Sequence, residues 1–207
     1  MASPVYTQED AAYWYVPLVR AIPAAAMACV VTFSGGNYSP DFGLFVFGGF
    51  TLLAGVLGVI LSIVSVTGVN RTIFLIQAIV SVLVGGTALF GWRTGLPLFL
   101  ALVSIWAVVA GFAELYAGIR VRGRRAVARD WIFVGAVTVL LAVFALVIPP
   151  GYVQHYTDPT GPRVLNTSVM VVGGLSVYGA IVAVYLLIAA FSLKWGPASA
   201  TRKGVAS

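Results

Sequence analysis

The chain has 207 residues, of which 60% are hydrophobic and only 9% are charged. A soluble domain carries roughly 25% charged residues because its surface must face water, so this composition excludes a soluble enzyme. The formal net charge of +6 would suggest nucleic-acid binding in a soluble chain. Here it is better explained by membrane topology, and we expect no nucleic-acid partner.

Six apolar runs of 18 or more residues follow one another along the chain. Each can cross a hydrocarbon core of about 30 Å at about 1.5 Å per residue. Each must be helical, because lipid cannot satisfy open backbone N–H and C=O groups. The predicted fold class is therefore an all-α membrane protein with six transmembrane helices. The runs cover residues 16–33, 43–67, 72–90, 96–119, 131–148 and 169–193.

The basic residues are distributed unequally between the two sides of the predicted bundle. With six spans, the side that holds both termini carries nine Lys and Arg residues, whereas the other side carries only Arg93 and Arg163. Cytoplasmic loops are enriched in Lys and Arg, so both termini are predicted to be cytoplasmic. The expected organisation is a cytoplasmic segment over 1–15, a six-helix bundle over 16–195 and a cytoplasmic tail over 196–207.

The fourth loop concentrates positive charge. Clustered basic residues beside a membrane helix attract anionic lipid headgroups as well as setting topology, so membrane lipids are expected partners. The candidate headgroup contacts are Arg120, Arg122, Arg124 and Arg125.

The helices are expected to form three sequential hairpins, each a repeat of about 57 residues. Three short stretches recur at a constant offset of 57 residues: Arg20-Ala21-Ile22, Gln77-Ala78-Ile79 and Val134-Gly135-Ala136. The third hairpin has a longer outer loop, over residues 149–167. One glycine lies at a similar place in the second helix of each hairpin: Gly55, Gly111 and Gly179.

Glu114 and Arg20 are charged residues within apolar runs, at similar depths from the inner end of the bundle. A charge at the centre of a membrane helix costs about 2.5–3.5 kcal/mol, so such a side chain normally faces the bundle interior. Opposite charges at matching depth reduce each other's burial cost, and we predict an intramembrane ion pair. Two alternatives are an Arg20 that extends to the headgroups and a proton or substrate pathway through Glu114.

Gln77 takes the place of Arg20 in the second repeat and is expected to hydrogen-bond between helices. His155 lies in the outer loop and is the only histidine. An imidazole changes charge in the mildly acidic range, which makes His155 a candidate for sensing external acidity, although one exposed histidine is usually inert. No metal site or cofactor is expected, because the sequence has no zinc motif, phosphate-binding loop or nucleophile elbow.

Two stretches carry a family resemblance. Residues 106–115 (WAVVAGFAEL) are followed by 118–122 (GIRVR), and the next run, from 133 (FVGA), ends in proline. This pattern resembles the fourth and fifth helices of the HdeD family. The resemblance implies a bacterial inner-membrane protein associated with acid resistance or envelope stress, without a defined biochemical activity. The first hairpin departs from the family pattern, since Ala21 replaces a glycine and Pro23 follows at once.

We therefore predict a non-enzymatic structural or stress-response protein of the bacterial inner membrane. One alternative is a small transporter or channel for protons or another small ion, which would use Glu114 and Arg20. Another is an accessory subunit of a larger membrane complex. Small residues spaced along the fourth run, such as Gly111 and Gly118, allow close helix approach and are compatible with a homo-oligomer or a larger complex.

Overall fold

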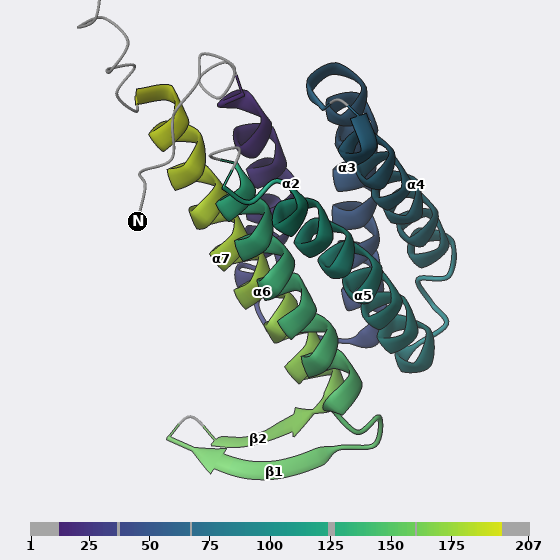
Figure 1. Ribbon diagram of the computed structural model, residues 1–207. Helices are drawn as coiled ribbons and strands as arrows, with labels where there is room; N and C mark the ends of the chain where they lie inside the picture. Colours follow the sequence, from purple (N-terminus) through teal and green to yellow (C-terminus); the bar gives the residue numbers. More distant parts are fainter. Residues whose placement is uncertain (1–12, 37, 67, 124–126, 160, 196–207) are drawn as a thin grey trace, which may run out of the picture.

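The computed structural model describes residues 13–195, except 37, 67, 124–126 and 160 (Figure 1). Within these residues, six helices are long and apolar enough to cross a membrane. The predicted all-α membrane fold is confirmed, and the predicted runs differ from the helices by only a few residues at their ends. The helices are α2 (Tyr15–Thr32), α3 (Pro40–Ser65), α4 (Gly68–Phe90), α5 (Leu96–Arg120), α6 (Ala128–Val147) and α7 (Thr167–Trp195).

Helix ends follow local sequence chemistry. Ser39 caps α3 by accepting a hydrogen bond from the Phe42 amide at 3.2 Å, and Pro40 occupies the first turn. Gly95, with φ of 89°, turns the chain into α5 in a conformation that other residues rarely adopt. These turns reverse the chain between successive helices, so neighbours in sequence run antiparallel.

The helices form a closed ring in which each one contacts the next along the chain and α7 returns to α2. Three contacts in this ring are the most extensive: α3 with α4, α5 with α6, and α2 with α7. The arrangement of three sequential hairpins as packing units is therefore not confirmed, because the tightest pairs join the second helix of one expected hairpin to the first helix of another. Contacts of α3 with α5 and α7 cross the centre of the ring.

Glycines explain why these three pairs are the tightest. A Cβ on Gly55 would lie 2.8 Å from the carbonyl oxygen of Ala78 on α4, and a Cβ on Gly111 would lie 3.2 Å from that of Gly135 on α6. A Cβ on Gly179 would lie 2.8 Å from the carbonyl oxygen of Ala24 on α2. Each glycine thus allows backbone-to-backbone contact that a larger residue would prevent.

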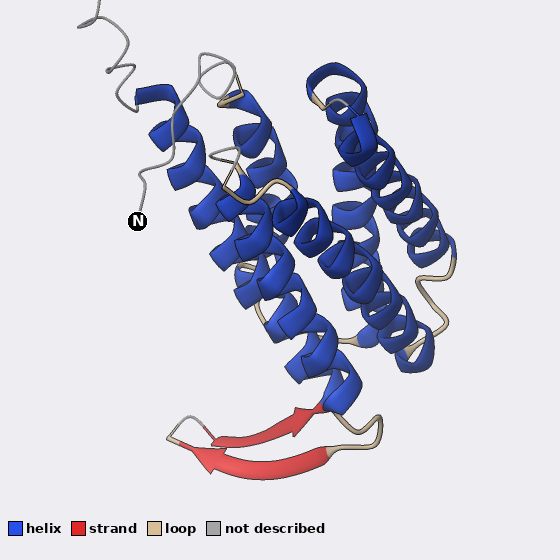
Figure 2. Cartoon of the chain, in the orientation of Figure 1, coloured by secondary structure: helices blue, strands red, loops and turns tan. Residues whose placement is uncertain are grey.

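A β-hairpin connects α6 to α7. Strands β1 (Val153–Asp158) and β2 (Gly161–Asn166) pair in antiparallel register, with His155 opposite Val164 (Figure 2). The Thr167 hydroxyl donates to the Pro149 carbonyl at 2.7 Å and closes the base of the loop. The sequence predicted an enlarged loop here but no strands. Figure 1 shows the hairpin at one end of the bundle, here called the outer end; α2 begins and α7 ends at the opposite, inner end.

The outward faces of the helices are apolar. Every helix from α2 to α7 exposes large hydrophobic side chains, and Phe90 is 95% exposed. Soluble monomers rarely expose contiguous apolar patches above a few hundred Å², so this surface suits lipid rather than water. Representative exposed side chains are Ile22, Leu53, Leu83, Phe112, Leu140 and Ile188.

Candidate functional site

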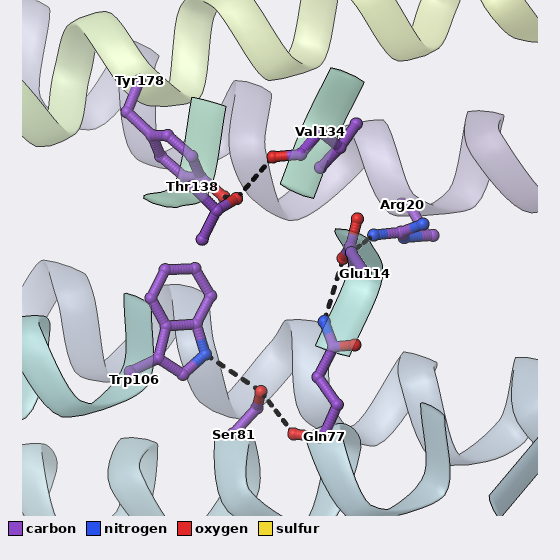
Figure 3. Close-up of polar contacts among 8 residues, drawn as sticks. All are labelled: Arg20, Gln77, Ser81, Trp106, Glu114, Val134, Thr138 and Tyr178. Carbon is purple, nitrogen blue, oxygen red and sulfur yellow. Dashed lines mark hydrogen bonds and ion pairs between the residues drawn. The ribbon is translucent and has the colours of Figure 1, made fainter. Parts of the chain in front are cut away.

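The centre of the inner half of the bundle contains an ion pair. The Arg20 guanidinium on α2 donates a hydrogen bond to Glu114 Oε1 on α5, so the structure brings together the two charged residues that the sequence singled out (Figure 3). The Glu114 side chain is 5% exposed and that of Arg20 is 24% exposed. The carboxylate is thus the more deeply buried partner.

The position of Glu114 follows from the pattern of α5. Small residues recur at steps of three and four along this helix, and all of them are buried together with Glu114. A seam of this kind faces the bundle, so the carboxylate is directed away from lipid. The seam consists of Ser104, Ala107, Gly111 and Gly118.

Gln77 on α4 completes a polar centre that consists of Arg20, Gln77 and Glu114. Its Nε2 donates to Glu114 Oε1 at 2.9 Å, so a single carboxylate oxygen accepts hydrogen bonds from both α2 and α4. Two acceptors remain buried without a hydrogen-bond partner among the described residues of the centre, Glu114 Oε2 and Gln77 Oε1. In Figure 3 the second carboxylate oxygen points away from Gln77, on the side of Val134.

A chain of two further hydrogen bonds leads from the polar centre toward the outer end. The Trp106 indole donates to Ser81 Oγ at 3.0 Å, and that hydroxyl donates to the Gln77 carbonyl at 2.9 Å. On the other side of the centre, Thr138 and the Tyr178 hydroxyl lie within hydrogen-bond distance at 3.0 Å. The indole of Trp106 and the hydroxyl of Tyr178 therefore each have a hydrogen-bond partner, as buried Trp and Tyr require.

Three aromatic rings close the space on the outer side of the polar centre. Phe50, Trp106 and Tyr178, from α3, α5 and α7, make mutual edge-to-face contacts with centroid distances of 5.3, 6.4 and 6.1 Å. Trp106 precedes Glu114 by eight residues, or about 12 Å along the helix. Farther out, Phe47 packs against Trp106 and Phe99, and both phenylalanines are fully buried.

A cavity of about 100 Å³ lies against the polar centre. Its lining includes Arg20, Gln77 and Glu114, together with the aromatic rings of Phe50 and Trp106. The only charged residues among the described lining residues are Arg20 and Glu114, so the cavity has no net formal charge.

The other residues predicted from the sequence lie away from this centre. Arg120 and Arg122 are exposed at the inner end of α5, and Arg124 and Arg125 lie outside the described residues. His155 is exposed on β1 at the outer end. In the part of the chain that the structure describes, no group of three or more His, Cys, Asp or Glu side chains could hold a metal ion.

Sequence reasoning missed two parts of the polar interior. It did not single out the Thr138–Tyr178 contact, nor the hydrogen bond at 3.0 Å from the Tyr185 hydroxyl to Asp130 Oδ1 between α7 and α6. The tyrosines within the apolar runs could have indicated these hydrogen bonds, since a buried phenol hydroxyl needs a partner. The sequence did not indicate which residue that partner would be.

Fold and centre together define the class: a multi-pass membrane protein whose helices enclose a buried ion pair. Comparison with models of protein families, with curated proteins and with solved structures finds no match. The resemblance to the HdeD family therefore stays a prediction from the sequence.

Proposed function

We propose that the protein is a non-enzymatic protein of the bacterial inner membrane, with both termini in the cytoplasm, in which the polar centre fixes the packing of the helices. The observation that carries this proposal is the double role of Glu114 Oε1, which accepts from Arg20 on α2 and from Gln77 on α4. A contribution to the response to acid or envelope stress is what the resemblance to HdeD implies.

The aromatic side chains outside the centre support a structural role over a conducting one. A proton leaving Glu114 for the outer end would have to pass the rings of Phe50, Trp106 and Tyr178 and then the buried Phe47 and Phe99. Water does not occupy apolar space without polar partners. This layer therefore acts as a barrier in the conformation described here.

A small proton or ion transporter is the second candidate, and one observation favours it. Glu114 Oε2 is buried without a hydrogen-bond partner in the described part of the centre and belongs to a residue that lines the cavity. An intramembrane carboxylate of this kind is typical of proton relays. Transport would additionally require the aromatic layer to open.

Association with other chains also belongs to the proposal. Gly49, Gly86 and Gly173 each have open space where a Cβ would lie, which leaves room for the close approach of another helix. These open positions on α3, α4 and α7 are compatible with a homo-oligomer or with membership of a larger membrane complex.

Proton flux separates the structural role from the transporter. Purified protein reconstituted into dye-loaded liposomes should acidify the lumen no faster than empty liposomes do, under an imposed potential and at neutral or acidic external pH. Asp130→Asn serves as the matched control for Glu114→Gln, because both substitutions neutralise a buried carboxylate. A flux that Glu114→Gln abolishes and Asp130→Asn preserves would refute the structural proposal and establish the transporter.

A further inference from the structure

We propose that the cavity binds a small aliphatic carboxylate through the guanidinium group of Arg20. The starting observation is that most of the hydrogen-bonding capacity of this group is unused. A guanidinium group carries several N–H donors, but Arg20 makes a single hydrogen bond with the described residues, from Nη2 to Glu114 Oε1 (Figure 3). Binding of a carboxylate goes beyond the proposed role of the ion pair in helix packing.

The unused donors of Arg20 are accessible from the cavity. The buried side-chain atoms that lack a partner in the described bundle belong to Asn70, Gln77 and Glu114, so the remaining nitrogens of Arg20 keep accessible surface. This surface does not face lipid, because Val16 and Ala24, one turn before and after Arg20 on the same face of α2, are buried. Arg20 lines the cavity. The 24% of its side chain that is exposed therefore lies where a ligand can reach it.

The ion pair presents its positive side to the cavity. Glu114 is only 5% exposed, and its free oxygen, Oε2, is buried. A molecule in the cavity therefore meets the guanidinium of Arg20 and not the free carboxylate oxygen, although the pair as a whole is neutral. A carboxylate is the acceptor that suits this group best, because hydrogen bonds between ionised partners are about twice as strong as neutral ones.

The charge of the inner end also favours an anion. The cavity lining extends to Tyr13 and Val66, which lie just before α2 and just after α3 at this end. A surface with an excess of one charge raises the local concentration of oppositely charged ligands. Among the described residues at the inner end of the helices, the basic ones outnumber the acidic Asp130: Arg71, Arg120, Arg122, Arg129 and Lys194.

Size and wall chemistry define the rest of the ligand. The cavity volume of about 100 Å³ is smaller than the roughly 150 Å³ of an engineered cavity that holds benzene. Phe50, Leu57 and Trp106 supply apolar walls. The ligand therefore joins one carboxylate to a short aliphatic chain, as propionate does.

Propionate and propionamide test the requirement for charge, because they have nearly the same shape and only propionate is an anion. Binding to the full chain in phosphatidylcholine nanodiscs is measured by ligand-observed NMR at neutral pH, against empty nanodiscs. We expect saturable binding of propionate and about tenfold weaker binding of propionamide, since the hydrogen bond to a charged acceptor is the stronger one. Hexanoate is too long for the cavity and should bind more weakly than propionate.

Three substitutions locate the site. Glu114→Gln removes the negative charge that competes for Arg20, so it should tighten propionate binding about tenfold and change propionamide binding by no more than about twofold. Ala54→Leu fills the cavity and leaves Arg20 in place, so it should abolish propionate binding. Ala101→Leu makes the same change on an exposed face of α5 and should leave binding unchanged.

The outcomes that overturn the proposal are distinct from those of the flux assay. Equal binding of propionate and propionamide, or propionate binding that Glu114→Gln weakens, would refute recognition of a carboxylate by Arg20. Binding that Ala54→Leu preserves would place the ligand outside the cavity, and hexanoate binding as tight as that of propionate would refute the size limit. Absence of propionate binding would mean that water alone serves the donors of Arg20, which also refutes the proposal.

Discussion

Removing Arg20 should destabilise the protein more than removing Glu114, although the two residues form one ion pair. Breaking a buried pair by deleting one partner leaves an uncompensated charge and costs about 3–5 kcal/mol when burial is complete. The two partners are not equally buried: the Glu114 side chain is 5% exposed and that of Arg20 is 24% exposed. The cost of each deletion is set by the charge that it leaves behind.

Arg20→Ala leaves a nearly buried carboxylate that retains only the hydrogen bond from Gln77. We expect a loss of about 3 kcal/mol in the free energy of unfolding, at the lower end of the range for buried pairs. Glu114→Ala leaves the more exposed Arg20, whose long side chain can extend toward the inner interface, and should cost about 1–2 kcal/mol. The double substitution leaves no charge and should lose about 1–2 kcal/mol less than the sum of the single losses.

Reversible unfolding of the purified protein in mixed micelles, at increasing mole fraction of denaturing detergent, gives the four free energies. Arg120→Ala is the control, because it removes an exposed arginine at the inner end of α5 and should change stability by no more than about 0.5 kcal/mol. Strictly additive losses would show that Arg20 and Glu114 do not interact. A larger loss for Glu114→Ala than for Arg20→Ala would show that the unequal burial of the two side chains does not set the cost of each deletion.

Adjacent glycines on α4 should respond in opposite ways: Gly85→Ala places a Cβ 2.5 Å from the Leu52 amide nitrogen and should cost about 1–3 kcal/mol. Gly86→Ala meets open space and should be neutral within about 0.5 kcal/mol, so equal losses in the same unfolding assay would contradict the tight contact of α3 with α4. In a Cys29→Ser background, an impermeant maleimide applied to intact cells should label His155→Cys and not Arg122→Cys, because the basic residues favour a cytoplasmic inner end. Labelling at position 122 would reverse the proposed topology.

Helix positions could be predicted from the sequence because the membrane imposes them. An apolar run of sufficient length must be helical in lipid, so the run 96–119 differs from α5 (Leu96–Arg120) by one residue. Which helices pack against each other is not determined by any such local property of the sequence. Gly179 contacts Ala24, more than 150 residues earlier in the chain, and only the folded structure shows that α7 returns to α2.

The polar centre was partly predictable for a related reason. A charge in lipid needs a partner, and matching depth was enough to connect Arg20 with Glu114. Gln77 was expected to hydrogen-bond between helices, but depth alone did not identify Glu114 as its acceptor. The aromatic layer of Phe50, Trp106 and Tyr178 was not predicted, because aromatic residues are common in membrane helices and their convergence depends on three separate helices.

The contact between α2 and α7 has a consequence for biosynthesis. Arg20 leaves the ribosome 94 residues before Glu114, which corresponds to roughly 5–20 s at typical rates of synthesis. During this interval the first helix carries a cation without its carboxylate, and the glycine contact that α7 provides does not yet exist. The first helix therefore enters the bilayer without two of the contacts that hold it in the folded protein, and its contact with α7 forms only after the last helix has been inserted. Nascent chains that end before residue 114 should accordingly remain substrates for membrane quality control.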